Sequence, residues 1–373
     1  MSSVKASVLH GVKDLRVESR ELPSPSPTEV QVQIQATGLC GSDLHYFNHY
    51  RNGDIIVREP LTLGHESAGT VTAVGSSVQN LKVGDRVALE VGQPCSKCAR
   101  CEEGRYNICK EMRFRSSAKS FPHFQGTLQD RINQDASFCY KLPDSVPLEM
   151  GAILEPLGVA MHAARRANLP AKSKVLVFGA GAVGLLCAAT AKVNGASEVI
   201  IADIQADRVD FAIANKFADS SVVVPMKRCA SIEEKLEFAK EVAALVANTN
   251  GTGEVDAVFE CTGVESCLQA AIYSTRPGGR ILMVGMGNPI QTLPISAAAL
   301  REVDLVGVFR YANTYEEAIK LVSSGNPLLP NLNSLISHRF KGLENIPTAF
   351  EMAAKVKDDS GKLVLKVLVD MQG

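Results

Sequence analysis

Two patterns of hydrophobic and polar positions divide this chain. Up to about Met150 the apolar runs are short, and Glu29–Ala36 alternates strictly between polar and apolar residues. Gly69–Gly75 and Gly84–Glu90 are similar runs bounded by glycine. Such alternation predicts strands with one buried face. Residues 113–126 are polar and irregular, which predicts a surface loop, so we expect the N-terminal part to be rich in short strands.

A different pattern begins near Lys174, where apolar runs alternate with amphipathic stretches of helical length. Strands alternating with helices of this length are typical of βαβ units and of a parallel sheet covered on both faces. The strand and helix pairs that we expect are Val175–Phe178 with Ala182–Asn194, Glu198–Ala202, Val222–Val224 with Ile232–Val246, Val255–Phe259 with Glu265–Ser274, and Arg280–Val284.

The last part of the chain returns to mixed elements, with strands expected at Leu305–Phe309 and Leu363–Val369 and a helix near Thr314–Ser323. A chain of 373 residues usually needs more than one hydrophobic core. We therefore predict an α/β protein in which a β-rich domain, residues 1–155 and 298–373, is interrupted by a doubly wound domain, residues 156–297.

Composition limits the classes of partner. The net charge of -1 and the absence of Trp disfavour nucleic acid and anionic lipid as partners. Neither a span of about 18 apolar residues nor an apolar N-terminal signal is present, so no membrane segment or secretion is expected. The 10 cysteines are too few for a disulfide scaffold. A cytoplasmic protein that acts on small molecules is the expectation.

A glycine-rich motif, Gly179-Ala-Gly181-Ala-Val183-Gly184, follows a predicted strand and opens a predicted helix. Glycines at this spacing allow a tight turn, close approach of a pyrophosphate and close packing of helix on strand. Asp203 ends the next strand, where a carboxylate accepts hydrogen bonds from ribose hydroxyls and repels a 2′-phosphate. The motif favours NAD over NADP. The alternative is a plain turn with Asp203 capping the next helix.

Two groups of residues suggest metal sites. Cys95, Cys98, Cys101 and Cys109 have the spacing of a closed, four-thiolate structural zinc site. Cys40, His65 and Glu66 suit a second, open zinc site with three protein ligands and a place for substrate. A buried core cysteine and a hydrogen-bonded His–Glu pair are the alternatives for the second group. Positions 66–70 contain no second histidine, which excludes the HExxH metalloprotease motif.

Together these stretches resemble the zinc-dependent medium-chain dehydrogenases over nearly the whole chain. Within that superfamily the chain is most similar to the polyol dehydrogenases, typified by sorbitol dehydrogenase. The residues that carry the resemblance are Cys40-Gly-Ser42-Asp43, Gly64-His65-Glu66, Gly84-Asp85-Arg86-Val87, the four cysteines, the Gly179–Gly184 motif, Phe138–Asp144, Leu154–Leu157, Glu260–Gly263 and Arg301–Tyr311.

The resemblance implies a GroES-like catalytic domain with an inserted Rossmann domain, NAD, and two Zn²⁺ ions, one catalytic and one structural. The alcohol dehydrogenases of this superfamily have a second zinc-binding Cys in the region of Glu155. Here the resemblance implies Glu66 as a direct ligand and Glu155 in contact with the metal through water. Which glutamate binds directly stays open at the level of sequence.

The resemblance also implies roles for other residues. Ser42 and His45 would carry the alcohol proton outwards, although His45 could equally be a surface residue, and Asp43 would orient a ligating histidine. Phe121 and Phe124 would either close the pocket or serve packing. The remaining assignments are Tyr46, Glu155, Arg310 and Tyr311 for the polyol, and Gly179, Gly181, Val183, Gly184, Asp203, Arg208, Val284, Gly285, Met286, Val308, Phe309 and Arg310 for the cofactor.

The implied reaction is NAD-dependent oxidation of a polyol to a ketose, sorbitol to fructose or xylitol to xylulose. An L-arabinitol 4-dehydrogenase is the alternative within the class. Two other classes are a zinc-free quinone oxidoreductase-like protein and a redox-regulated binding protein in which zinc serves as a thiol switch. Members of this family are commonly tetramers or dimers, so the resemblance implies a homo-oligomer, with a tetramer as the expectation. The strand near Arg280–Gly287 is expected to pair across a two-fold axis.

Overall fold

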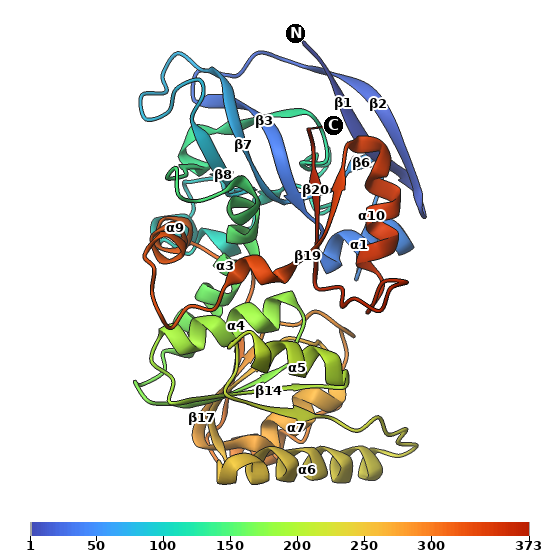
Figure 1. Ribbon diagram of the computed structural model, residues 1–373, viewed down its shortest axis with the longest axis vertical. Coiled ribbons are helices and arrows are strands. Elements are labelled where there is room, and N and C mark those ends of the chain that lie inside the picture. Colours follow the sequence, from blue (N-terminus) through green and yellow to red (C-terminus); the bar gives the residue numbers. More distant parts are fainter. Residues whose placement is uncertain (1, 373) are drawn as a thin grey trace. The chain divides into compact units, whose positions relative to one another are not determined.

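The computed structural model describes residues 2–372, and the chain divides into two compact units (Figure 1). The chain passes from the first unit to the second after Glu155 and returns after Tyr311. The return comes later than the expected residue 298, because β18 (Asp304–Gly307) still pairs with the sheet of the second unit. The first unit comprises Met1–Glu155, Ala312–Ser324 and Leu332–Gly373, and the second Pro156–Tyr311 and Gly325–Asn331.

The second unit contains a six-stranded sheet in the order β15-β14-β13-β16-β17-β18, and all five pairings are parallel. This is the doubly wound order in which a dinucleotide binds at the carboxyl ends of the strands. The α/β fold class is thus confirmed. The strands and helices are β13 (Lys174–Phe178), α4 (Ala182–Val193), β14 (Glu198–Asp203), α5 (Ala206–Ala214), β15 (Ser220–Val223), α6 (Ile232–Asn248), β16 (Val255–Glu260), α7 (Glu265–Ser274), β17 (Thr275–Met283), α8 (Ile295–Ala299) and β18.

Helix α6 shows how the sequence pattern becomes structure. Ser231 caps its N-terminus by accepting a hydrogen bond from the backbone N–H of Glu234. Its buried positions include Phe238, Val242 and Val246, one helical turn apart, and they pack in the core of the second unit. Charged residues such as Glu237, Lys240 and Glu241 lie on exposed positions, so the N-cap and the periodicity together define the helix.

Strand β17 corrects one expectation. It has β16 on one side and β18 on the other, so it offers no free edge for pairing across a two-fold axis. The strand at that end of the sheet is β18.

The first unit is built around a mixed sheet in the order β12-β8-β7-β3-β20-β19, with β11 also pairing with β3. Strands β3 and β20 come from opposite ends of the chain and lie side by side, antiparallel (Figure 1). A second, three-stranded sheet has the order β2-β1-β6. The strands are β1 (Ser2–Gly11), β2 (Asp14–Leu22), β3 (Glu29–Gly38), β4 (Arg51–Asn52), β5 (Ile55–Ile56), β6 (Leu61–Thr62), β7 (Glu66–Val74), β8 (Arg86–Leu89), β9 (Gly92–Gln93), β10 (Arg113–Phe114), β11 (Arg131–Asp135), β12 (Cys139–Lys141), β19 (Ile336–Lys341) and β20 (Lys366–Asp370).

Helices at both ends of the first unit share one core. The rings of Phe47 and Phe350 stack with their centroids 4.8 Å apart, which joins α1 to α10. The sequence pattern indicated neither α10 nor β19. The helices of this unit are α1 (Gly41–His49), α2 (Ala99–Glu102), α9 (Tyr315–Ser323) and α10 (Ile346–Ala353), and α3 (Leu148–Ala167) runs from this unit into the next.

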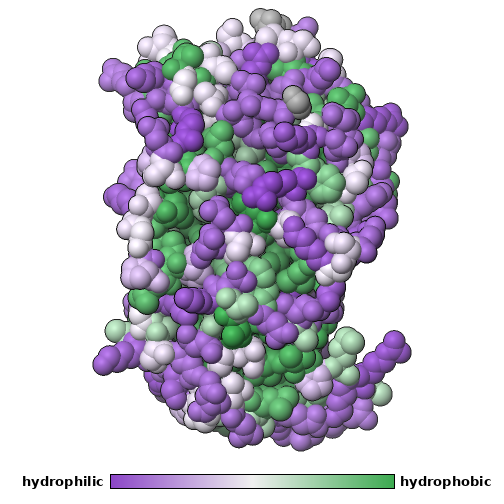
Figure 2. Space-filling view, viewed as in Figure 1, coloured by the Kyte–Doolittle hydropathy of each residue, from purple (hydrophilic) through white to green (hydrophobic). Residues whose placement is uncertain are grey.

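Hydrophilic side chains cover much of the visible surface of both units, with hydrophobic ones between them (Figure 2). Within residues 2–372, none of the helices combines the length and the hydropathy that a membrane span requires. Several strongly exposed apolar residues flank β17 and β18, among them Ile290 and Leu300, each 87% exposed.

Candidate active site

Cys40, His65 and Glu66 meet because β3 and β7 are neighbours. Gly38, the last residue of β3, pairs with Glu66, the first residue of β7. Cys40 follows two residues after β3 as the N-cap of α1, so its thiol comes to the His65–Glu66 pair. One ligand atom from each of the three side chains lies within 4.8 Å of the others, and His65 and Glu66 are buried. The donor set of thiolate, imidazole and carboxylate fits a zinc ion.

The His65 ring is oriented by Asp43, which is fully buried. Asp43 accepts hydrogen bonds from His65 Nδ1 at 3.2 Å, from Ser116 Oγ and from the backbone N–H of Gly64. This contact fixes the tautomer that presents Nε2 as the ligand atom. Ser42 Oγ lies 3.5 Å from that Nε2.

The neighbouring side chains favour the charged forms of both Asp43 and His65. Burial would raise the pKa of Asp43, but the charge of His65 and the hydrogen bonds from His65, Ser116 and Gly64 outweigh it and lower the pKa. Burial likewise opposes protonation of His65, yet the charges of Asp43 and Cys40 raise its pKa well above 6.5. A metal ion that binds His65 therefore has to displace a proton from its ring.

Lys366, which sequence reasoning missed, is a further charged group at this site. Its Nζ donates to both carboxylate oxygens of Glu66 at 2.7 Å and to the backbone oxygen of Leu39 at 3.1 Å. Burial would lower the pKa of Lys366, but the charges of Glu66 and Cys40 and the Glu66 hydrogen bond raise it. The available signal was a single Lys in the apolar stretch Leu363-Val-Leu-Lys-Val-Leu-Val369.

The other residues expected near this site fall into different environments. Glu155, on α3, is 5% exposed and lies near enough for its charge to act on Lys366, but it is outside the three-ligand group. His45 is exposed on α1. Tyr46 is 2% exposed, and its hydroxyl accepts a hydrogen bond from the backbone N–H of Ala118.

The two phenylalanines of the 113–126 loop differ. The guanidinium groups of Arg113 and Arg115 lie 4.5 and 4.2 Å from the ring centroid of Phe124, so this ring serves packing. Phe121 is 60% exposed, with the Arg58 guanidinium 4.7 Å from its ring centroid. Of the two rings, Phe121 is therefore the more exposed.

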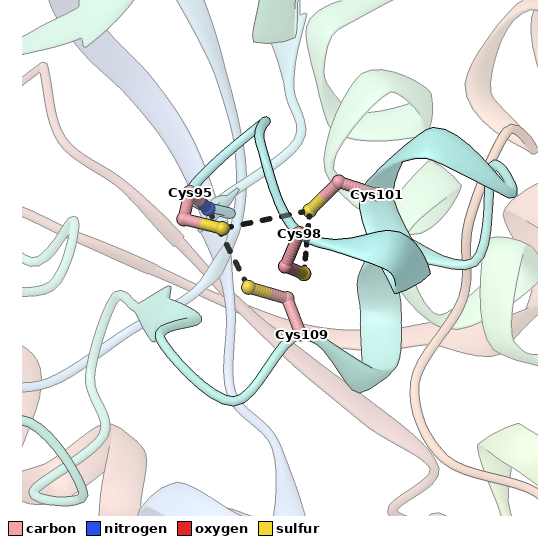
Figure 3. A group of neighbouring side chains, drawn as sticks. All are labelled: Cys95, Cys98, Cys101 and Cys109. Atoms are coloured by element: carbon pink, nitrogen blue, oxygen red, sulfur yellow. Dashed lines mark hydrogen bonds between the residues drawn. The ribbon is translucent and has the colours of Figure 1, made fainter.

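The four cysteines of the 95–109 lobe point toward one another (Figure 3). Cys98 Sγ lies 3.5 Å and Cys95 Sγ 4.0 Å from Cys101 Sγ. A tetrahedron with Zn–S bonds of about 2.3 Å has S–S edges of about 3.8 Å, so the lobe fits zinc. The pKa of Cys98 is lowered to about 7, chiefly by the backbone N–H of Cys101, whereas desolvation raises that of Cys101 to about 12.

The glycine-rich motif forms the turn from β13 into α4. A Cβ on Gly184 would lie 1.8 Å from the backbone oxygen of Gly179, so only glycine fits there. A Cβ on Gly181 would meet nothing closer than 3.9 Å, which leaves the approach to this residue open. Asp203 accepts hydrogen bonds from the N–H groups of Ala180 at 2.7 Å and Gln205 at 2.9 Å, which ties the turn to the end of β14.

The other expected cofactor residues lie at the same edge of the sheet. Val284 and Gly285 follow β17, and Val308 follows β18, so all stand at carboxyl ends of parallel strands, as Gly179 and Asp203 do. Arg208 Nε is buried without a hydrogen-bond partner among the described residues, and its Nη1 lies near Gly181. This edge can thus offer both N–H groups and a guanidinium to an anion. The remaining expected cofactor residues lie nearby in sequence. Val183 belongs to the first turn of α4, and Met286 is exposed. The Arg310 guanidinium lies over the Phe309 ring.

Comparison with known proteins identifies the family. The model of the alcohol dehydrogenase GroES-like domain matches residues 26–144, and that of the zinc-binding dehydrogenases matches residues 182–324. Sorbitol dehydrogenase of Gallus gallus is 42% identical over 361 residues, 97% of this chain and 96% of the relative. L-idonate 5-dehydrogenase of Vitis vinifera is 38% identical over 94% of this chain and 91% of the relative. A solved Escherichia coli oxidoreductase of unknown specificity covers both chains fully at a TM-score of 0.85 and 30% identity.

The chain therefore belongs to the zinc-containing, medium-chain alcohol dehydrogenase superfamily. Within it, the chain is a zinc-dependent polyol dehydrogenase of the sorbitol dehydrogenase type. The resemblance found in the sequence is confirmed, and the zinc-free quinone oxidoreductase-like class and the non-enzymatic thiol switch are set aside.

Proposed function

We propose that this dehydrogenase oxidises a secondary alcohol of a polyol to a ketone, with sorbitol and xylitol as substrates and NAD as the hydride acceptor. The observation that carries the proposal is the Cys40, His65 and Glu66 group, held in register by the pairing of β3 with β7 and oriented by Asp43. In this reaction the carbon that bears the hydroxyl loses a hydride to NAD, and the hydroxyl loses a proton.

The roles of the chain's own residues follow from their positions. Cys40, His65 and Glu66 would hold a catalytic zinc, which when bound supplies Lewis acidity that lowers the pKa of the substrate alcohol. Glu155 stands outside the three ligands, which supports a contact through water. Ser42, beside His65 Nε2, would take the alcohol proton, and exposed His45 on the same helix would pass it to solvent.

For the cofactor, two observations support binding of a dinucleotide pyrophosphate and ribose at this edge: the open approach to Gly181, and the Arg208 Nε, which has no hydrogen-bond partner within residues 2–372. The Asp203 carboxylate would repel the 2′-phosphate of NADP. Tyr46, Glu155, Arg310 and Tyr311 are the proposed polyol contacts, and the four-cysteine lobe would hold the structural zinc.

An initial-rate panel tests the proposal and resolves the substrate. It compares sorbitol, xylitol, L-arabinitol, galactitol and L-idonate with NAD and NADP. We expect NADH formation with sorbitol and xylitol, lost on chelation and in Cys40→Ala. L-arabinitol or L-idonate as the preferred substrate would reassign the specificity, and turnover that survives chelation would refute the mechanism.

We also propose that the protein is cytoplasmic and a homo-oligomer, a tetramer by analogy with relatives. Within residues 2–372, β18 is an end strand of its sheet, and Ile290 and Leu300, in the segment between β17 and β18, are strongly exposed, which supports association through this region. Analytical ultracentrifugation of the wild-type protein measures the state, and a monomer at micromolar concentration would overturn it.

A further inference from the structure

Asn313 ties the four-cysteine lobe to a segment far along the chain, through its backbone and its side chain. The backbone N–H of Asn313 donates to Tyr106 Oη at 2.7 Å, and its Nδ2 donates to the backbone oxygen of Gly104 at 2.7 Å. Both acceptors lie between Cys101 and Cys109, inside the proposed zinc-binding loop. Asn313 itself has a φ of 55°, in the left-handed region that few side chains tolerate.

The Tyr106 hydroxyl is held in a defined orientation. It donates to Glu90 Oε1 at 2.7 Å, and Glu90 is 1% exposed. Because the hydroxyl proton is directed at the carboxylate, a lone pair of the same oxygen faces the N–H of Asn313. A second tyrosine, Tyr140, donates to Glu90 Oε2 at 2.8 Å.

The chain just after Asn313 is anchored independently. Tyr315 is 1% exposed, its hydroxyl donates to the backbone oxygen of Leu89 at 2.7 Å, and its ring stacks on that of Tyr140 at 5.0 Å. With Tyr315 fixed on β8 and Asn313 fixed on the cysteine lobe, the backbone between them has little freedom. Arg310 and Tyr311 precede this fixed segment, with only Ala312 between Tyr311 and Asn313, and Arg310 also has a positive φ, 51°.

We propose that Tyr106 is a positioning residue for the polyol. Its hydrogen bond with Asn313 couples the four-cysteine lobe to the Arg310–Tyr311 segment and so fixes the conformation of that segment. The proposal rests on the proposed function, which assigns these two residues to the substrate. It gives the lobe a role in substrate affinity in addition to stability.

Two matched variants separate positioning from stability. Tyr106→Phe and Tyr140→Phe each remove one hydroxyl that donates to Glu90, but only Tyr106 also binds Asn313. A purely structural role predicts lower melting temperatures for both and the same KM in both. Positioning predicts that Tyr106→Phe alone raises the KM for the polyol, by about tenfold, the equivalent of one lost hydrogen bond. The same variant should keep kcat and zinc content within about twofold of wild type.

The measurements are initial rates over a range of sorbitol concentration at saturating NAD, and zinc content per chain. Equal KM values in wild type and both variants would overturn the inference, as would a parallel loss of zinc in Tyr106→Phe. Wild-type protein that forms no NADH with any polyol would overturn the proposed function instead, so the two failures are distinguishable.

Discussion

The Lys366 ammonium lies 2.7 Å from both carboxylate oxygens of Glu66, and side chains 300 positions apart in sequence thereby form an almost completely buried ion pair. Glu66 therefore has both a cation and the two other candidate zinc ligands, Cys40 and His65, as close neighbours. The ammonium compensates the carboxylate charge in protein without metal, which keeps the ligand group assembled.

Replacing Lys366 by Met should leave Glu66 as an uncompensated buried charge. We expect the chelated variant to lose about 3–5 kcal/mol of unfolding free energy relative to chelated wild type. Added zinc should restore part of the loss, because the cation again compensates Glu66. Urea denaturation with and without zinc measures both effects. Lys355→Met, which breaks an exposed pair with Asp359, is the control and should hardly move the midpoint. Equal stability of the two chelated variants would contradict this account.

Asp43→Asn should weaken zinc binding at the open site by about 10–100-fold, because His65 loses the carboxylate that orients its ring. Competition with a chromophoric chelator measures the affinity. The four-cysteine lobe provides an internal control, since its zinc should be retained. Ser116→Ala removes only one neutral donor from Asp43 and should have a smaller effect. An unchanged affinity in Asp43→Asn would mean that Asp43 has no such role.

The residues of the site differ in how well they could be predicted from the sequence. Repeating patterns predicted the second unit well: Glu265–Ser274 was expected as a helix and is α7, and Arg280–Val284 lies largely within β17. Residue type and spacing indicated Cys40, His65 and the four cysteines, because few side chains bind zinc. Neither route could find Lys366 or Glu90, whose partners are set by long-range pairing of strands. The end of the second unit was predicted too early, because nothing in the local sequence of β18 indicates that it pairs with the sheet of that unit.

Cofactor choice tests Asp203. Asp203→Asn removes the charge while keeping a carbonyl oxygen that can accept from Ala180 or Gln205. The ratio of kcat/KM for NADP to that for NAD should rise by about tenfold or more, because one charge repulsion with the 2′-phosphate disappears. Asp210→Asn, an exposed carboxylate on α5, is the matched control and should leave the ratio unchanged. Wild-type activity restricted to NADP would refute the role of Asp203.

The cysteine lobe is expected to serve stability and positioning but not chemistry. Cys98→Ser should lower the melting temperature by several degrees and reduce zinc content by one ion per chain, because one of four thiolate ligands is lost. The folded fraction should keep its kcat. Cys229→Ser, outside the lobe, should change neither quantity. A fully folded Cys98→Ser protein without turnover would contradict a structural role.

Glu90 makes stability depend on pH in a direction that can be worked out. Burial raises the pKa of Glu90 above 4.5, although the hydrogen bonds from Tyr106 and Tyr140 oppose the shift. Between pH 4.5 and the raised pKa the folded protein binds more protons at this site than the unfolded chain does. The contribution of Glu90 to unfolding free energy therefore falls as pH rises through this window, by at most about 1.4 kcal/mol per pH unit.

Glu90→Gln removes this titration while keeping a side chain of the same size. The difference in unfolding free energy, wild type minus variant, should therefore decrease as pH is raised from about 5 to 7.5. Urea denaturation across that range measures it. Glu111 is exposed, so the corresponding difference for Glu111→Gln should not decrease over this pH range. If the Glu90→Gln difference is flat, Glu90 keeps the same charge across the range in the folded protein. If the difference grows with pH, the two tyrosine hydroxyls outweigh burial and the pKa of Glu90 is lowered.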